Sequence, residues 1–169
     1  MTQPAASGGA VGLSPADAPL PVDSEKKPAK ASASVDIAAS PDRVWQLIGG
    51  FGSLPDWLPY IPKSDLNDGG RVRHLANPNG EVIVERLEAF DDLGRSYSYS
   101  ILQAPFPVTG YLSTLRVLPH GGGSRVQWSG TFTPRCVSLA EASRLFQGIF
   151  EDGLKALVDR FTGKKSSSA

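Results

Sequence analysis

Two charged residues, Arg73 and Glu85, lie inside strand-like runs, where each can share a face of its strand with apolar side chains. Successive side chains of a strand point to opposite faces, so Glu85 can share a face with Ile83 and Leu87. A carboxylate among apolar side chains is costly unless it is paired or protonated, so an inward Glu85 needs a partner such as Arg73. A carboxyl group held between burial and a facing arginine can move protons on a bound substrate.

Other placements of these two residues are open from the sequence alone. Val82 and Val84 alternate with Glu85, which makes the opposite face of the same strand an acceptable buried face. Charged residues are usually exposed, so Arg73 and Glu85 could instead form a solvated ion pair at the rim of the sheet.

The neighbouring strand-like runs predict an apolar concave face that carries a few hydroxyl groups. In the last run, Val126, Trp128 and Phe132 alternate with polar residues and define the inward side. The same alternation predicts that alternate residues of the two preceding runs also face inward. They are Tyr97, Tyr99, Ile101, Tyr111, Ser113, Leu115 and Val117. The hydroxyl of Tyr99 or Tyr111 could therefore also bond an inward Glu85.

The positions of these residues depend on a predicted antiparallel sheet of seven strands. A first run contains Val35 and Ile37, and six more follow at hairpin spacing over residues 63–66, 71–76, 81–90, 95–103, 108–119 and 124–133. Turn sequences rich in Asp, Asn and Gly separate the runs, which favours hairpins over crossover connections.

A long amphipathic helix is predicted after the last strand, over residues 138–161. Ser138 and Glu141 have the spacing of a capping box, and apolar residues, among them Phe146 and Phe150, recur at helical spacing. Gly148 and Gly153 each cost about 1 kcal/mol relative to alanine inside a helix. They indicate either room for a ligand beside the helix or close packing against the sheet.

Two shorter elements are expected between the first and second strands. Ser40 and Pro41 are typical of a helix start, and Gly49 and Gly50 end that helix. The proline-rich segment 52–62 is either a second short helix or a loop. In it, Trp57 and Tyr60 could form an aromatic gate at a pocket mouth or could simply pack on the core.

Composition argues against several classes of protein. Seventeen basic residues balance seventeen acidic ones, which argues against nucleic-acid binding, and a single cysteine with two histidines argues against a disulfide framework or a metal site. No apolar run is long enough to cross a membrane, and the N-terminal region lacks a secretory signal pattern. We therefore expect a soluble cytoplasmic protein without membrane insertion.

The domain limits follow from composition. Residues 1–30 are rich in Ala, Pro, Gly and Ser and have few large apolar side chains, so we expect a disordered N-terminal tail. We expect the same of residues 163–169, with one domain of residues 31–162 between the two tails.

The order of these elements, with Val44-Trp45 in the first helix and Asp56-Trp57-Leu58-Pro59 after it, resembles the START-like (SRPBCC) superfamily of the birch pollen allergen. The resemblance is to its polyketide cyclase/dehydrase and lipid transport branch. It implies an α+β helix-grip fold, in which a curved seven-stranded sheet and two short helices enclose a hydrophobic cavity with the long helix.

Within that superfamily, the segments 70–73, 84–87, 97–101 and 110–115 look like the lachrymatory factor synthases and their bacterial relatives. The resemblance implies catalytic roles for the residues at the matching positions, which are Arg73, Glu85, Tyr99 and Tyr111.

Together these observations predict a cofactor-independent lyase, isomerase or cyclase that acts on a small hydrophobic molecule. The alternative is a non-catalytic carrier of a lipid, polyketide or aromatic compound. We expect no cofactor and no metal, a monomer or homodimer, and a ligand-binding surface made by Trp57, Tyr97, Ile83, Ser113, Trp128, Phe146 and Phe150.

Overall fold

Seven strands form one antiparallel sheet in the order β1-β7-β6-β5-β4-β3-β2. The structure is a computed structural model and describes residues 27–163. Its strands are β1 (Ala29–Ile37), β2 (Lys63–Asn67), β3 (Val72–Ala76), β4 (Val82–Asp91), β5 (Ser96–Gln103), β6 (Val108–His120) and β7 (Gly123–Pro134). From β2 to β7 each strand pairs with the next one along the chain, as expected for a hairpin meander, and β1 closes the order by pairing with β7.

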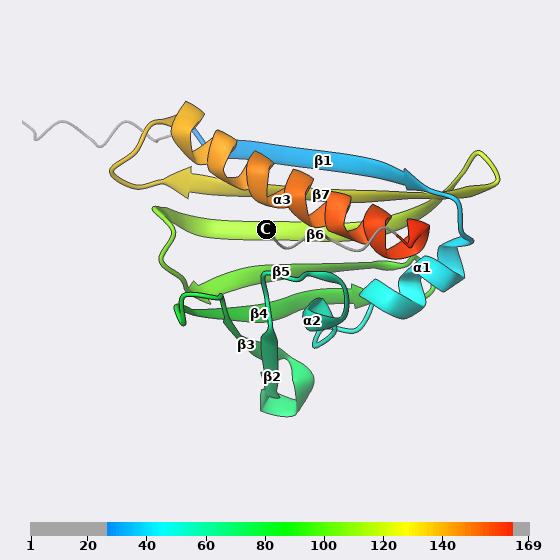
Figure 1. The fold of residues 1–169 in the computed structure, drawn as a ribbon. Helices are drawn as coiled ribbons and strands as arrows, with labels where there is room; N and C mark the ends of the chain where they lie inside the picture. The colour runs from blue at the N-terminus through cyan, green and yellow to red at the C-terminus, as the bar shows by residue number, and fades with distance from the viewer. Residues whose placement is uncertain (1–26, 164–169) are drawn as a thin grey trace, which may run out of the picture.

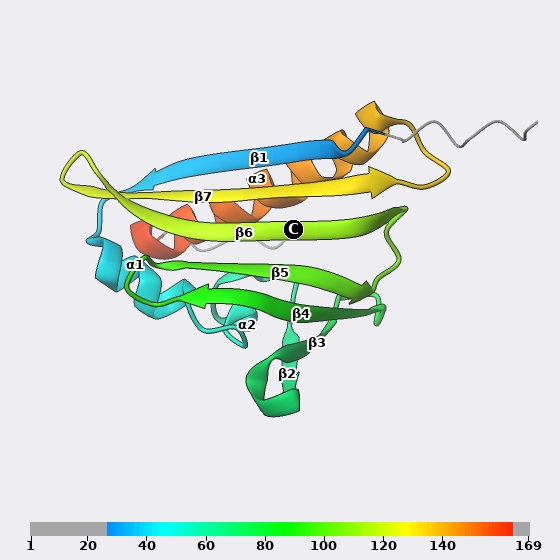
Figure 2. The same cartoon turned by 180° about the vertical axis from the view of Figure 1, so that it is seen from behind.

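The long helix α3 (Leu139–Thr162) packs on β1 and β7, against the inner face of the sheet. Figure 1 shows α3 lying across these strands, and Figure 2 shows the opposite face, which carries no helix. The capping box is present: the Ser138 hydroxyl accepts from the Glu141 N–H at 3.1 Å, and the Glu141 carboxylate accepts from the Ser138 N–H at 2.8 Å. The predicted α+β helix-grip fold is confirmed.

Two short helices follow β1, and Figure 1 shows α1 near one end of the sheet. In α1 (Pro41–Ile48), the Ser40 hydroxyl caps the first turn by accepting from the Arg43 N–H at 3.3 Å. The helix α2 (Leu54–Trp57) is a single turn that begins beside Pro55, so the proline-rich segment contains a helix, and a short 3-10 turn, η1 (Asp68–Gly70), links β2 to β3. Among residues 27–163, no helix is long and apolar enough to span a membrane.

The first strand begins earlier than the sequence pattern predicted. Ala29 and Lys30 pair with Phe132 and Thr131 of β7, so the strand starts two residues before the expected domain start at residue 31. Ala29 and Ala31 are buried, because strand β1 runs close under α3 and small side chains fill the narrow space. The remainder of the predicted tails, residues 1–26 and 164–169, lies outside the described residues.

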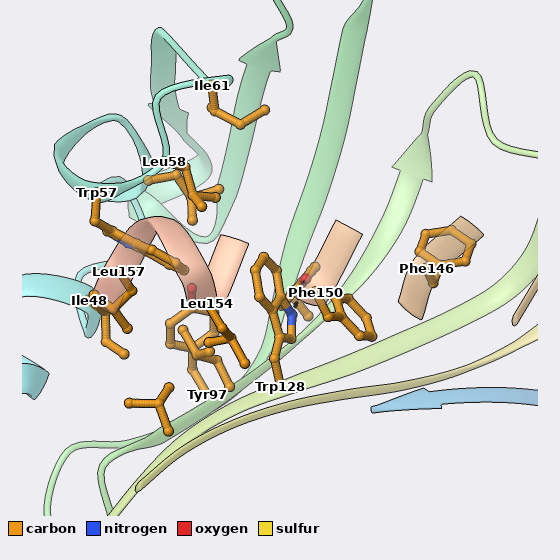
Figure 3. Close-up of a cluster of buried hydrophobic side chains, with 14 of the residues drawn as sticks. Ile48, Trp57, Leu58, Ile61, Tyr97, Trp128, Phe146, Phe150, Leu154 and Leu157 are labelled. Carbon is orange, nitrogen blue, oxygen red and sulfur yellow. Dashed lines mark hydrogen bonds between the residues drawn. The ribbon is translucent and has the colours of Figure 1, made fainter. Parts of the chain in front are cut away.

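The core lies between α3 and the inner face of the sheet, where aromatic rings of the two elements pack against one another (Figure 3). Trp128 of β7 stacks on Phe150 of α3 with ring centroids 4.9 Å apart, and Phe132 lies 4.6 Å from Phe146. Val126, Trp128 and Phe132 are buried as the alternation of β7 predicted. Tilted and stacked aromatic pairs of this kind stabilise beyond their buried area.

The two glycines of α3 have different surroundings. A Cβ on Gly153 would lie 2.6 Å from Cζ3 of Trp128 and 2.7 Å from the hydroxyl oxygen of Tyr60, so this glycine permits close packing. A Cβ on Gly148 would have no atom within 4 Å. Close packing therefore explains Gly153, whereas nothing in the described structure requires a glycine at position 148.

This difference predicts opposite effects of two alanine substitutions. Gly153→Ala forces Trp128 or Tyr60 to shift and should lower the free energy of unfolding by about 1–3 kcal/mol, as overpacking does. Gly148→Ala should raise the free energy of unfolding by up to about 1 kcal/mol, since it removes only the helix cost of glycine. Chemical denaturation of both variants measures the two effects, and a destabilised Gly148→Ala variant would contradict the assignment.

Candidate functional site

A cavity of about 240 Å³ lies between α3 and the inner face of the sheet. Its wall is mostly apolar and is shared among the sheet, α3 and the segment that follows α2. The lining residues are Leu54, Leu58, Tyr60, Ile61, Arg73, Leu75, Asn77, Pro78, Ile83, Glu85, Tyr99, Ile101, Phe106, Tyr111, Trp128, Phe146, Ile149 and Phe150.

Arg73 and Glu85 stand directly opposite each other on β3 and β4. The adjacent inward pair on these strands, Leu75 and Ile83, is apolar and buried, so the register places both charges on the core side. Arg73 Nε donates to Glu85 Oε2 at 2.6 Å, and the two residues are only 1% and 7% exposed. The ion pair is therefore internal, and neither the rim placement nor the opposite face of β4 occurs.

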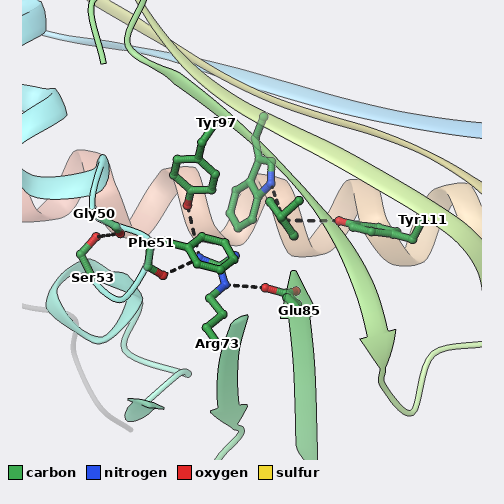
Figure 4. A network of polar contacts seen from close by, with 9 residues as sticks. Gly50, Phe51, Ser53, Arg73, Glu85, Tyr97 and Tyr111 are labelled. Atoms are coloured by element: carbon green, nitrogen blue, oxygen red, sulfur yellow. Dashed lines mark hydrogen bonds and ion pairs between the residues drawn. The ribbon is translucent and has the colours of Figure 1, made fainter. Parts of the chain in front are cut away.

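Further contacts fix the Arg73 guanidinium in place (Figure 4). Arg73 Nη1 donates to the carbonyl oxygen of Phe51 at 3.0 Å and to the hydroxyl oxygen of Tyr97 at 3.4 Å. The ring of Phe51 lies 4.2 Å from the guanidinium carbon and the ring of Tyr99 lies 4.7 Å from it, which are cation–π distances. Burial acts to lower the pKa of Arg73, but the adjacent Glu85 carboxylate together with the hydroxyls of Tyr97 and Tyr99 raises that pKa overall, so the guanidinium stays charged.

A second polar group is formed by two tyrosines and a tryptophan. Trp128 Nε1 donates to the Tyr99 hydroxyl at 3.0 Å, and the hydroxyl oxygens of Tyr99 and Tyr111 are 3.5 Å apart. Because Trp128 occupies an acceptor position of Tyr99, the phenolic proton of Tyr99 points to another partner. Burial is the main cause that raises the pKa of Tyr99 and of Tyr111, so both phenols are neutral donors at physiological pH.

Each member of the ion pair has one atom that is free for a further contact. Among residues 27–163, no side chain or carbonyl bonds Arg73 Nη2, and no donor bonds Glu85 Oε1. Both residues line the cavity. The pair can therefore offer a charged donor and a carboxylate acceptor to one bound molecule, which is the combination that general acid–base chemistry needs.

The structure brings the four residues that were predicted to be catalytic, Arg73, Glu85, Tyr99 and Tyr111, to the wall of one cavity. Of the predicted ligand-binding residues, those that line it are Ile83, Trp128, Phe146 and Phe150.

Three predicted ligand-binding residues do not line this cavity. Trp57 packs its ring 5.8 Å from that of Trp128 inside the core, so of the expected aromatic gate only Tyr60 reaches the cavity wall. Tyr97 lies behind Arg73 and bonds it, and the Ser113 hydroxyl donates to the carbonyl oxygen of Ser129 at 2.7 Å. The inward strand positions of Tyr97 and Ser113, and the position of Trp57 in α2, therefore place these side chains in the core but not at the ligand space.

Other lining residues were missed because they lie outside regular strands, where alternation gives no information. Asn77 and Pro78 belong to the β3–β4 turn, and Phe106 belongs to the β5–β6 connection. Phe51, which contacts Arg73 through both its ring and its backbone carbonyl, was also missed, and the bond to the carbonyl is one for which residue type gives no signal. The Asn-Pro-Asn-Gly turn was recognisable, but its proximity to the cavity follows only from the curvature of the sheet.

Comparison with known proteins defines the family. A family model described as polyketide cyclase / dehydrase and lipid transport matches residues 28–162. Because this match spans nearly all of the described residues, the chain belongs to that family. The resemblance to the START-like superfamily is thereby confirmed, whereas the closer likeness to lachrymatory factor synthases stays a prediction.

Individual relatives agree with this assignment. The chain is similar to the MLP-like protein 423 of Arabidopsis thaliana, with 30% identity over 111 residues that cover 58% of this chain and 72% of that protein. The structure of XoxI from Bacillus cereus superposes with a TM-score of 0.77 at 61% identity, over 79% of this chain and 96% of that one. A START superfamily protein from Mycobacterium smegmatis has a TM-score of 0.66 at 18% identity, over 81% and 99% of the two chains, which shows the fold alone.

The internal ion pair predicts strongly non-additive effects on stability. Glu85→Leu alone leaves a buried guanidinium without its counter-ion and should lower the free energy of unfolding by about 3 kcal/mol or more. Adding Arg73→Met to that variant should restore most of the loss, because no uncompensated charge then remains. Denaturation of the two single variants and the double variant forms the cycle. A double variant that loses the sum of the two single effects would show that the pair is solvated.

Proposed function

We propose that this protein binds a small, mostly apolar molecule in the cavity and catalyses a cofactor-independent acid–base rearrangement, cyclisation or elimination on it. The observation that carries the proposal is the buried Arg73–Glu85 pair in a mostly apolar cavity wall, in which Nη2 and Oε1 bond no other group among residues 27–163. Stability alone does not require this buried ion pair, since apolar side chains of similar volume often stabilise a protein at least as well.

In the proposed reaction, Arg73 Nη2 binds and polarises an oxygen of the substrate. Glu85 removes a proton next to that oxygen and returns it at another atom of the same molecule, so the step needs no oxidant or reductant. Tyr99 and Tyr111 donate hydrogen bonds that hold the substrate while its charge shifts. The apolar wall excludes water, which strengthens these electrostatic contacts and keeps the reacting atoms in place.

A carrier function is the second candidate, and the apolar character of most lining residues favours it. In a carrier the binding free energy would come mainly from apolar contact, at about 25 cal/mol per Å² buried, and the ion pair would only orient the ligand. A cytoplasmic location and a monomeric or homodimeric state stay predictions from the sequence.

Turnover by wild-type protein and by Glu85→Gln separates the two functions. Each protein is incubated with a small-molecule extract of the organism that makes it, and the products are compared by chromatography with mass spectrometry, which also resolves isomers. We expect one or more compounds to be converted by the wild type and at least 100-fold more slowly by Glu85→Gln, because the substitution keeps the shape but removes the base.

Glu88→Gln is the matched control, because Glu88 lies on the same strand with its side chain exposed and bonded to Ser100. This variant should convert the same compounds at the wild-type rate. If wild type and Glu85→Gln both enrich the same unchanged compound, the protein is a carrier and the enzymatic proposal is wrong.

A further inference from the structure

The part of the cavity wall that residues 27–163 form has no net charge. Its titratable residues are Arg73, Glu85 and three tyrosines, and the one cation and the one anion are 2.6 Å apart. Burial is the main cause that raises the pKa of each tyrosine, namely Tyr60, Tyr99 and Tyr111, so all three are neutral at physiological pH. A bound molecule therefore meets a guanidinium whose charge is already balanced.

A carboxylate ligand would break this balance. It would lose its hydration and lie close to the buried Glu85 carboxylate. The Arg73 guanidinium is already paired with that carboxylate. An ion in an apolar site is costly without its own counter-ion, and two nearby like charges add repulsion. A cationic ligand faces the same difficulty, because Arg73 lies beside Glu85, which is the only carboxylate that the described part of the chain places in the wall.

Two other polar side chains of the cavity wall already bond to the protein. At the β3–β4 turn, Asn77 Oδ1 accepts from the N–H groups of Asn79 and Glu81 at 3.0 and 2.9 Å, and Asn77 Nδ2 donates to Glu81 Oε2 at 2.6 Å. Tyr60 donates to the carbonyl oxygen of Ile149 at 3.3 Å. The atoms left for a ligand are thus the Arg73 Nη2 donor, the Glu85 Oε1 acceptor and the phenols near them.

The cavity size limits the rest of the molecule. A ligand that fills about 240 Å³ at the packing density of a protein interior has about ten non-hydrogen atoms. This is one ring or a short chain plus a polar group, and it is smaller than a typical drug-sized ligand.

We propose that the cavity selects an electrically neutral molecule of about ten non-hydrogen atoms whose polar group both accepts and donates a hydrogen bond, and that it discriminates against carboxylates. An amide, an oxime, an enol or a hydroxyl next to a carbonyl meets this description. The inference rests on the proposed function, because it concerns the occupant of the same cavity.

Four probes of nearly equal size test the selection. Benzamide is neutral with a donor and an acceptor, benzoate is an anion, benzylammonium is a cation, and toluene has no polar group. Dissociation constants are measured by titration calorimetry with the intact chain at neutral pH. We expect benzamide to bind wild-type protein at least tenfold more tightly than each of the other three.

Charge-changing variants test the cause of the selection. Glu85→Gln leaves Arg73 without its counter-ion, so the preference should invert and benzoate should bind more tightly than benzamide. If that variant does not fold, the double variant Arg73→Met with Glu85→Leu replaces it. The double variant should lose the preference for benzamide over toluene, while Glu88→Gln should bind all four probes as the wild type does.

Tighter binding of benzoate than benzamide by wild type, or unchanged selectivity in the charge variants, would overturn the inference. Failure of all four probes to bind would also overturn it, because the assigned size and polar group would then be wrong. Failure of the proposed function gives a different result: benzamide is preferred as expected, but no compound of the extract is converted. Conversion of a carboxylate compound would uphold the function and overturn the selection.

Discussion

Removing a guanidinium and a carboxylate from water costs several kcal/mol per ion, and a protein recovers this only if the two groups meet in good geometry with further hydrogen bonds. Arg73 and Glu85 have this good geometry because β3 and β4 pair in a register that places the two residues opposite each other. The carbonyl of Phe51 and the hydroxyl of Tyr97 then satisfy Nη1. The loop between α1 and α2, the β3–β4 hairpin and strand β5 are all tied to this one pair.

The same pair explains how the helix-grip fold provides a chemical site. The curved sheet and α3 form a mostly apolar cavity, and one strand pair adds two opposite charges to its wall (Figure 4). Because the charges balance each other, the cavity stays suited to a mostly apolar molecule and still offers a donor and an acceptor. Tyr99 and Tyr111, neutral because they are buried, extend this polar end without adding charge.

Strand alternation placed Tyr99, Tyr111 and Trp128 inward, where the structure has them, but it left both faces of β4 open for Glu85. It failed where burial and access to the cavity differ: Tyr97 and Ser113 are buried in the core but do not line the ligand space. Alternation reports which face of a strand a residue is on, whereas the cavity wall depends on curvature and on the depth of α3.

Strand alternation could not predict the roles of turn and loop residues, because it gives information only inside strands. Phe51 bonds Arg73 partly through a backbone carbonyl, and Asn77 lines the cavity from a turn, where strand alternation gives no information. The start of β1 at Ala29 was not predicted from composition, because small alanine side chains are typical of a disordered tail as well as of a strand packed under a helix.

A crystal structure of the protein with bound benzamide would locate the polar group of the ligand relative to the ion pair. We expect the Arg73–Glu85 contact to be kept, with the benzamide oxygen on Arg73 Nη2 and its amide N–H on Glu85 Oε1. Benzamide bound only among apolar side chains, or an Arg73–Glu85 contact broken by the ligand, would contradict this expectation.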